Sequence, residues 1–208
     1  MSDLFGEWVP DSWIDEVFAA CEKAPQHNYL FLTKNPHRYN EYGVDAYTIP
    51  GIFNLWYGMS VTTEAQFDKT WLLPEYCNTF ISIEPILEDL HTRDMDARFE
   101  NLDWMIVGAE TGIQKEKGVP KREWIEQIME SSRKYEIPLF MKSSLAQIWG
   151  EPLIKESAMD MHLARKQREL TALLRCWLKR EGGVDSWIET KCIWKCQNLQ
   201  GRMFQYQL

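Results

Sequence analysis

The sequence predicts an α/β protein, an incomplete (β/α) barrel with about five parallel strands and flanking helices, plus a C-terminal helical tail. Five near-continuous apolar runs, rich in β-branched and aromatic residues, are typical of strands covered on both faces. The runs start roughly 25 residues apart, which is the spacing of βα units. Each run ends on polar residues, at the position where parallel sheets and barrels bind their ligands.

The first elements expected are a helix and the strand YLFLTKN over residues 29–35. Ser12 and Asp15 have the spacing of a capping box, and apolar residues then recur at helical intervals. Pro36 ends the strand, because proline cannot donate to a sheet. The poorly periodic residues 36–54 predict a short helix and a loop.

Two more strands follow, WYGMSVTT over residues 56–63 and FISIEP over residues 80–85. Between them, Thr63 and Gln66 form a second capping-box pattern, which opens a predicted helix containing Phe67 and Trp71. An acidic, irregular connection is expected after the second of these strands.

The central strand is MIVGAETG, residues 105–112, which stops on a carboxylate and opens into a glycine turn. Pro120 suits the first turn of the next helix. PLFMKSS, residues 138–144, is the last predicted strand. Residues 159–180 then predict one amphipathic helix in the tail.

Charge divides the chain into two predicted domains, residues 1–156 and residues 157–208. The first carries 14 Lys/Arg and 26 Asp/Glu, whereas the second carries 9 and 5. The overall net charge of −8 makes nucleic-acid binding an unfavourable interpretation. With no apolar run of membrane-spanning length, we expect a cytoplasmic protein whose five cysteines are reduced.

Alternation along the strands places the polar strand-end residues on one face of the sheet. The expected members of this site are Lys34, Ser60, Thr62, Glu84, Gly108, Glu110 and Lys142. Carboxylates on neighbouring strands with a lysine between them are typical of acid/base and ligand sites. The alternative is a buried ion-pair network that only closes the core.

Metal binding is not predicted from the cysteines and histidines. Cys192 and Cys196, with Cys176, match no common zinc or iron–sulfur spacing, and the four histidines are scattered. The sequence contains neither a P-loop nor a GxSxG elbow.

Several blocks resemble a family of uncharacterised phage and prophage proteins, which is similar to a divergent branch of the radical S-adenosylmethionine barrels. The resemblance rests on MSDLFGEWVPDSWI, YLFLTKNP, ISIEPIL, MIVGAETG and PLFMKSSL…WGEPLI, in that order over residues 1–155. It implies S-adenosylmethionine as cofactor, with Ser60, Glu84 and Glu110 at positions that hold its nucleoside and amino-acid parts.

The same resemblance implies a [4Fe–4S] cluster, held by cysteines on a first strand upstream of MSDLF. This chain begins after that motif, and Cys21 and Cys77 do not take its place. We therefore expect a barrel truncated at its N-terminus, with no cofactor cluster and no activity alone.

Two other hypotheses remain open. In one, the chain is a phage-encoded interaction module, because a missing first strand would leave residues 29–35 at an exposed sheet edge. Such an edge would recruit a second copy or a partner chain. In the other, the chain is a cluster-independent enzyme that uses Glu84, Glu110 and the lysines directly.

Overall fold

The computed structural model describes residues 3–44, 54–74, 77–90, 99, 102–111 and 119–159. The predicted tail helix lies almost entirely outside these residues, as does most of the predicted second domain. Within the described residues no helix combines the length and the apolar character needed to cross a membrane.

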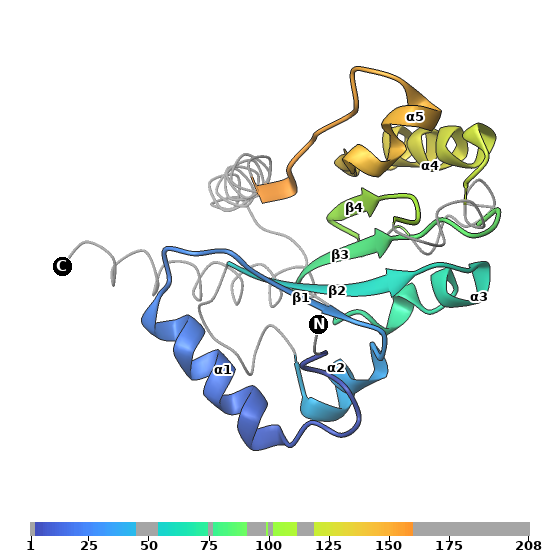
Figure 1. The fold of residues 1–208 in the computed structure, drawn as a ribbon. Helices are drawn as coiled ribbons and strands as arrows, with labels where there is room; N and C mark the ends of the chain where they lie inside the picture. The colour runs from blue at the N-terminus through green and yellow to red at the C-terminus, as the bar shows by residue number, and fades with distance from the viewer. Residues whose placement is uncertain are drawn as a thin grey trace, which may run out of the picture. The chain divides into compact units, whose positions relative to one another are not determined.

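One sheet of five parallel strands forms the centre of the described chain (Figure 1). Its strands are β1 (Tyr29–Thr33), β2 (Leu55–Val61), β3 (Asn78–Ile83), β4 (Trp104–Val107) and β5 (Leu139–Met141). They lie side by side in the order of the chain, and every neighbouring pair is parallel. The predicted α/β class and all five predicted strands are therefore confirmed.

Helices connect and flank these strands. The α-helices are α1 (Asp11–Lys23), α2 (His37–Tyr42), α3 (Glu64–Phe67), α4 (Arg122–Lys134) and α5 (Ala146–Trp149). Short 3-10 helices, η1 (Thr70–Leu72) and η4 (Ser143–Leu145), continue the turns after α3 and β5. The short helix predicted within residues 36–54 is confirmed as α2.

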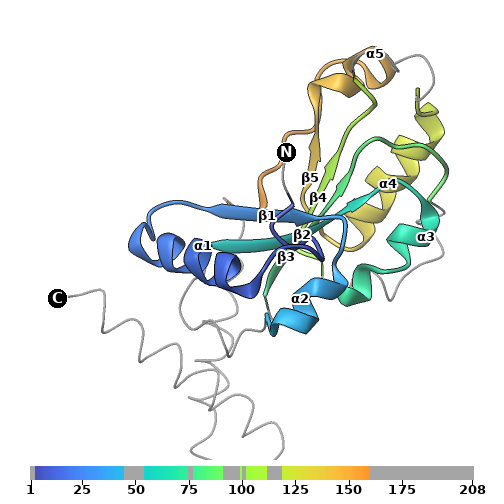
Figure 2. The ribbon, with the colours of Figure 1, turned by 60° about the horizontal axis from the view of Figure 1, so that its bottom comes forward.

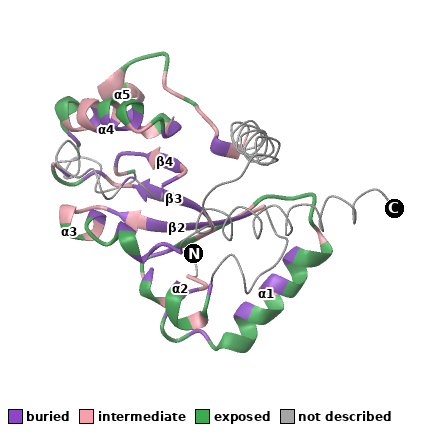
Figure 3. Ribbon diagram, turned by 180° about the vertical axis from the view of Figure 1, so that it is seen from behind, coloured by how far each residue is buried: buried purple, intermediate pink, exposed green. Residues whose placement is uncertain are grey.

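One face of the sheet is covered by helices, and we call it the helix-covered face (Figure 2). Odd-numbered strand residues such as Tyr57, Ile81 and Met105 pack there against Phe18 of α1 and Ile125 of α4. Burial of these apolar side chains supplies the main driving force for folding. Strands β2 to β5 are accordingly mostly buried, whereas β1 alternates between half-buried and exposed residues before the buried Thr33. The outer side of α1 is exposed (Figure 3).

The opposite face, formed by even-numbered strand residues, is called the second face here. Aromatic rings cover the part of this face nearer the amino ends of the strands. Trp104 contacts Trp56, Phe80 and Phe140 there, at ring centroid distances of 6.2, 6.2 and 6.3 Å. Phe80 lies over Gly58, where a Cβ atom would come within 2.3 Å of the ring. Side chains thus fill the second face beneath the polar strand ends.

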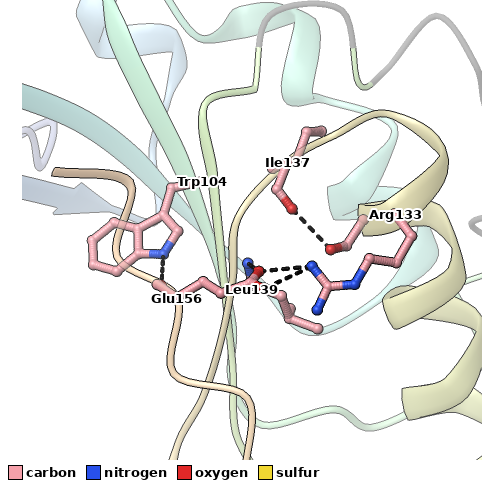
Figure 4. A network of polar contacts seen from close by, with 6 residues as sticks. Trp104, Arg133, Ile137, Leu139 and Glu156 are labelled. Atoms are coloured by element: carbon pink, nitrogen blue, oxygen red, sulfur yellow. Dashed lines mark hydrogen bonds and ion pairs between the residues drawn. The ribbon is translucent and has the colours of Figure 1, made fainter. Parts of the chain in front are cut away.

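The free edge of β5 is covered by the chain itself. The Met141 N–H donates to the Ile154 carbonyl, and the Glu156 N–H donates to the Leu139 carbonyl. The Glu156 carboxylate also accepts hydrogen bonds from Arg133 and from the Leu139 N–H (Figure 4). Its backbone carbonyl accepts the indole N–H of Trp104 at 3.0 Å. Residues 153–156 are therefore fixed to β4, β5 and α4.

Two predicted helix starts and one predicted helix end are wrong, whereas the start predicted at Thr63 is confirmed, because Thr63 is the N-cap residue of α3. Helix α1 begins at Asp11 without a side-chain cap, so Ser12 lies inside it. Helix α4 begins at Arg122, so Pro120 precedes the first turn. The helix expected to contain Trp71 ends at Phe67, and Trp71 is exposed in η1.

Candidate functional site

Glu84 and Lys142 form the centre of the candidate site. The Lys142 Nζ atom makes an ion pair with the Glu84 carboxylate, and the two side chains are 40% and 27% exposed. Glu84 directly follows β3, and Lys142 directly follows β5. Because strand residues alternate between faces, both lie on the second face at the carboxyl end of the sheet.

Gly108 lies between these two residues and leaves space for the carboxylate. A Cβ atom at this position would approach Glu84 Oε1 to 2.8 Å. The Gly108 N–H donates to the Ile83 carbonyl, and its own carbonyl accepts the Ile86 N–H. The Lys142 N–H donates to the Val107 carbonyl at 2.8 Å. Backbone pairing therefore continues past the strand ends and positions all three residues.

Two serines, Ser60 and Ser82, lie on the same face nearer the middle of the sheet. The register aligns Ser60 of β2 with Ser82 of β3, and Ser82 with Ile106 of β4. Ser60 is half-buried, whereas Ser82 is 5% exposed. Ser82 is absent from the predicted site, although its separation of two residues from Glu84 places it on the same face.

A further serine joins the strand ends. Ser144 of η4 accepts a hydrogen bond from the Ala109 N–H at 3.0 Å and thereby links the ends of β4 and β5. The sequence carries no signal for this contact, because it depends on how η4 folds back after β5.

Thr62 and Lys34 are not brought into this group. The N–H and the hydroxyl of Thr62 both donate to the Gln66 side-chain oxygen, so Thr62 fixes the turn from β2 into α3. Lys34 is exposed beyond the edge strand β1, and its backbone N–H donates to the Asp3 carboxylate. The carboxylate of Glu84 is paired by Lys142, not by Lys34.

Glu110 follows Gly108 by two residues and is half-buried. Its neighbour Ala109 belongs to the core on the helix-covered face. In the described part of the chain, Glu110 makes no ion pair or hydrogen bond. The structure thus places it after β4 without joining it to the Glu84–Lys142 pair.

The described cysteines lie away from the strand ends. Cys21 is buried in α1 against the helix-covered face, and burial raises the pKa of its thiol. Cys77 precedes β3. Burial is the largest cause that raises the pKa of Tyr57, and both cysteines raise that pKa further. Among the described residues, no group of three or more His, Cys, Asp and Glu is placed to hold a metal ion. The three tail cysteines lie outside these residues.

The site can recognise a ligand that carries both donors and acceptors. A carboxylate accepts hydrogen bonds from ammonium and hydroxyl groups, and a lysine provides a positive charge for an anionic group. Partial exposure leaves Glu84 and Lys142 accessible to such a ligand.

Comparisons with other proteins place the chain in one family. No curated protein and no solved structure matches it. A family model described as "protein of unknown function (DUF5131)" matches residues 1–181, which is most of the chain. The chain therefore belongs to the DUF5131 family.

Proposed function

We propose that the chain is an incomplete (β/α) barrel related to the radical S-adenosylmethionine enzymes, and that its strand ends bind S-adenosylmethionine or a similar nucleoside. The strand order supports this proposal, because barrels keep their parallel strands in chain order, whereas doubly wound sheets reverse it. The position of the site also supports it, since barrels bind ligands at the carboxyl ends of their strands.

The Glu84–Lys142 pair carries the proposal. S-adenosylmethionine has an amino-acid part, with an ammonium and a carboxylate group, and a ribose with two free hydroxyl groups. Glu84 can accept from the ammonium or the hydroxyls, and Lys142 can attract the carboxylate. Gly108 leaves room for the Glu84 carboxylate beside the backbone of the strand end.

Radical chemistry is not part of the proposal. Ligation of a [4Fe–4S] cluster needs clustered thiolates, and neither Cys21 nor Cys77 faces the strand ends. The described residues do not fit the cluster. We therefore propose binding without reductive cleavage of the ligand by this chain alone.

Calorimetric titration of the metal-free full-length chain with S-adenosylmethionine and S-adenosylhomocysteine tests the proposed binding. We expect saturable binding that weakens about tenfold, or about 1.4 kcal/mol, in Glu84→Gln, because the amide loses the charge but keeps the shape. Glu126→Gln is the matched control, because Glu126 is an exposed carboxylate paired with Arg122 on α4. Absence of binding, or equal binding by Glu84→Gln, would contradict the proposal.

Anaerobic reconstitution with iron and sulfide, followed by iron analysis and an absorbance scan, tests the expected lack of radical chemistry. We expect no stoichiometric iron and no band that reduction bleaches. About four irons per chain, the content of one [4Fe–4S] cluster, would contradict the proposed lack of a cluster.

A second proposed function is an interaction module that binds a protein chain at the edge of β1. The observation in its favour is the difference between the two edges of the sheet. Residues 153–156 cover the outer edge of β5, whereas β1 is the other terminal strand and its side chains Leu30 and Leu32 are exposed. Exposed strand edges bind extended segments of other chains.

A further inference from the structure

The outer edge of β1 presents unpaired backbone groups over a short, defined length. The Tyr29 N–H donates to the carbonyl of Asn54, the residue before β2. In this register the backbone N–H and C=O groups of Tyr29, Phe31 and Thr33 point toward β2. Strand residues alternate, so the backbone groups of Leu30 and Leu32 point away from the sheet. In the part of the chain that the structure describes, these outward groups have no partner.

The N-terminal segment limits this edge at one end. The next outward group, the Lys34 N–H, donates to the Asp3 carboxylate at 2.9 Å, and the same carboxylate accepts the Thr33 hydroxyl. The unpaired stretch is therefore Leu30–Leu32, and it is centred on Phe31.

This stretch lacks the features that keep sheet edges from pairing. Natural edge strands are protected by charged side chains, proline or bulges. Here the two residues whose backbone groups point outward are Leu30 and Leu32, and their side chains lie on the second face, 40% and 38% exposed. In the register they lie beside Trp56 and Gly58 of β2. An added strand would bury both leucines as well as pair the backbone groups.

We propose that β1 pairs with β1 of a second copy of this chain, antiparallel and about a twofold axis at Phe31. In this register Leu30 lies opposite the partner's Leu32. Two residues whose groups both point outward then form a hydrogen-bonded antiparallel pair, in which each donates to the other. The twofold axis repeats this pair, so every outward group of Leu30 and Leu32 gains a partner, and the leucines of both copies meet on one face.

The opposite edge explains why pairing between copies would give a closed dimer. A head-to-tail contact of β1 with β5 of the next copy would build an open filament. That contact is blocked, because residues 153–156 already bond to the outer edge of β5. Twofold β1–β1 pairing remains, and it uses the same surface on both copies. This inference rests on the interaction proposed for the β1 edge and is independent of the ligand site.

Sedimentation equilibrium of the full-length chain over a wide concentration range tests the dimer. We expect a reversible monomer–dimer equilibrium. Leu30→Lys should shift it at least tenfold toward monomer, because the substitution places the two lysines diagonally across the twofold axis and removes the apolar contact with the partner's Leu32. Leu87→Lys, which adds the same charge at an exposed leucine after β3, should leave it unchanged.

Proline tests the register itself. Leu32→Pro removes an outward N–H without removing a β1–β2 hydrogen bond, so it should abolish the dimer while the circular dichroism spectrum stays native. Leu32→Ala keeps that N–H and should retain more of the dimer. In addition, Leu30→Cys/Leu32→Cys should oxidise to a covalent dimer, whereas Leu30→Cys alone should not.

A monomer at all concentrations would overturn the proposal, and hydrogen exchange would then show whether the chain itself covers Leu30 and Leu32. A dimer that persists in both Leu30→Lys and Leu32→Pro would show that the copies associate elsewhere. A monomer whose β1 edge binds an added extended peptide would overturn the dimer but leave the interaction function standing.

Discussion

At the scale of single residues, two glycines on the second face have different neighbours. A Cβ atom at Gly58 would meet the Phe80 ring within 2.3 Å, whereas a Cβ atom at Gly108 would meet the flexible end of Glu84 at 2.8 Å. Phe80 is fully buried and cannot move aside. Glu84 is partly exposed and can turn away.

These neighbours predict stability changes of different size for two alanine substitutions. Gly58→Ala should lower the free energy of unfolding by roughly 1–3 kcal/mol through overpacking. Gly108→Ala should change it by less than about 1 kcal/mol, since alanine also restricts the unfolded chain. It should still weaken ligand binding, because the Glu84 carboxylate is displaced. Urea unfolding and calorimetry measure the two effects, and equal loss of stability in both variants would contradict this account.

Buried tyrosines predict a loss of stability at alkaline pH. Burial raises the pKa of Tyr39 and of Tyr57 well above the usual tyrosine value. A group whose pKa is raised by folding stabilises the protein below its unfolded pKa, and this contribution is lost as pH rises through the folded pKa. The free energy of unfolding should therefore fall above roughly pH 10.

Tyr39→Phe separates this effect from general alkaline unfolding. The Tyr39 hydroxyl donates to the carbonyls of Gly58 and Phe31 at 2.8 and 3.0 Å, so its removal should cost about 1 kcal/mol at neutral pH. The variant should also lose less stability between pH 9 and pH 11 than the unchanged chain. An identical alkaline decline in urea titrations would show that Tyr39 does not contribute.

Side-chain alternation was sufficient to predict that Glu84, Gly108 and Lys142 share one face. It was not sufficient for Thr62 and Lys34, because their contacts depend on neighbours outside the strands. Gln66 reaches back to Thr62, and Asp3 reaches the backbone of Lys34 across 31 positions of sequence. Contacts to side chains outside the strands leave no periodic signal, whether the partner is four residues away or 31.

At the scale of elements, Glu156 holds residues 153–156 against the sheet. Its carboxylate accepts the N–H of the fully buried Leu139, and Arg133 bonds to both of its oxygens (Figure 4). Glu156→Ala should lower the free energy of unfolding by about 1–3 kcal/mol, because a buried N–H loses its acceptor. Arg133→Ala should cost less than about 1 kcal/mol, since that ion pair is partly exposed. Thermal or urea unfolding would contradict this order if Arg133→Ala were the more damaging change.

The strands were predictable as elements, whereas the helix ends were not. Continuous apolar runs mark buried parallel strands, and every one of these runs forms a strand. The helix ends were misplaced because their N-caps are residues such as Pro10 and Lys121, which make no side-chain cap hydrogen bond. Capping-box spacing at Ser12 was therefore misleading, whereas Thr63 is the N-cap residue of α3, although its side chain makes no cap hydrogen bond.

At the scale of the whole molecule, the spacing of strands predicted a parallel sheet in chain order, and this order is observed. The cover over β5 was not predictable, because residues 153–156 add one antiparallel bridge without an apolar run of their own. This cover makes the two edges of the sheet unequal. Because β5 is covered, we propose β1 as the edge for association.

Amide hydrogen exchange of the full-length chain, with and without saturating S-adenosylmethionine, tests the ligand site most directly. We predict added protection at the carboxyl ends of β2 to β5, around Ser60, Glu84, Gly108 and Lys142, and none on the outer side of α1. The same ligand should protect these amides much less in Glu84→Gln. Protection confined to other segments, or no change at a ligand concentration that saturates binding, would contradict a strand-end site.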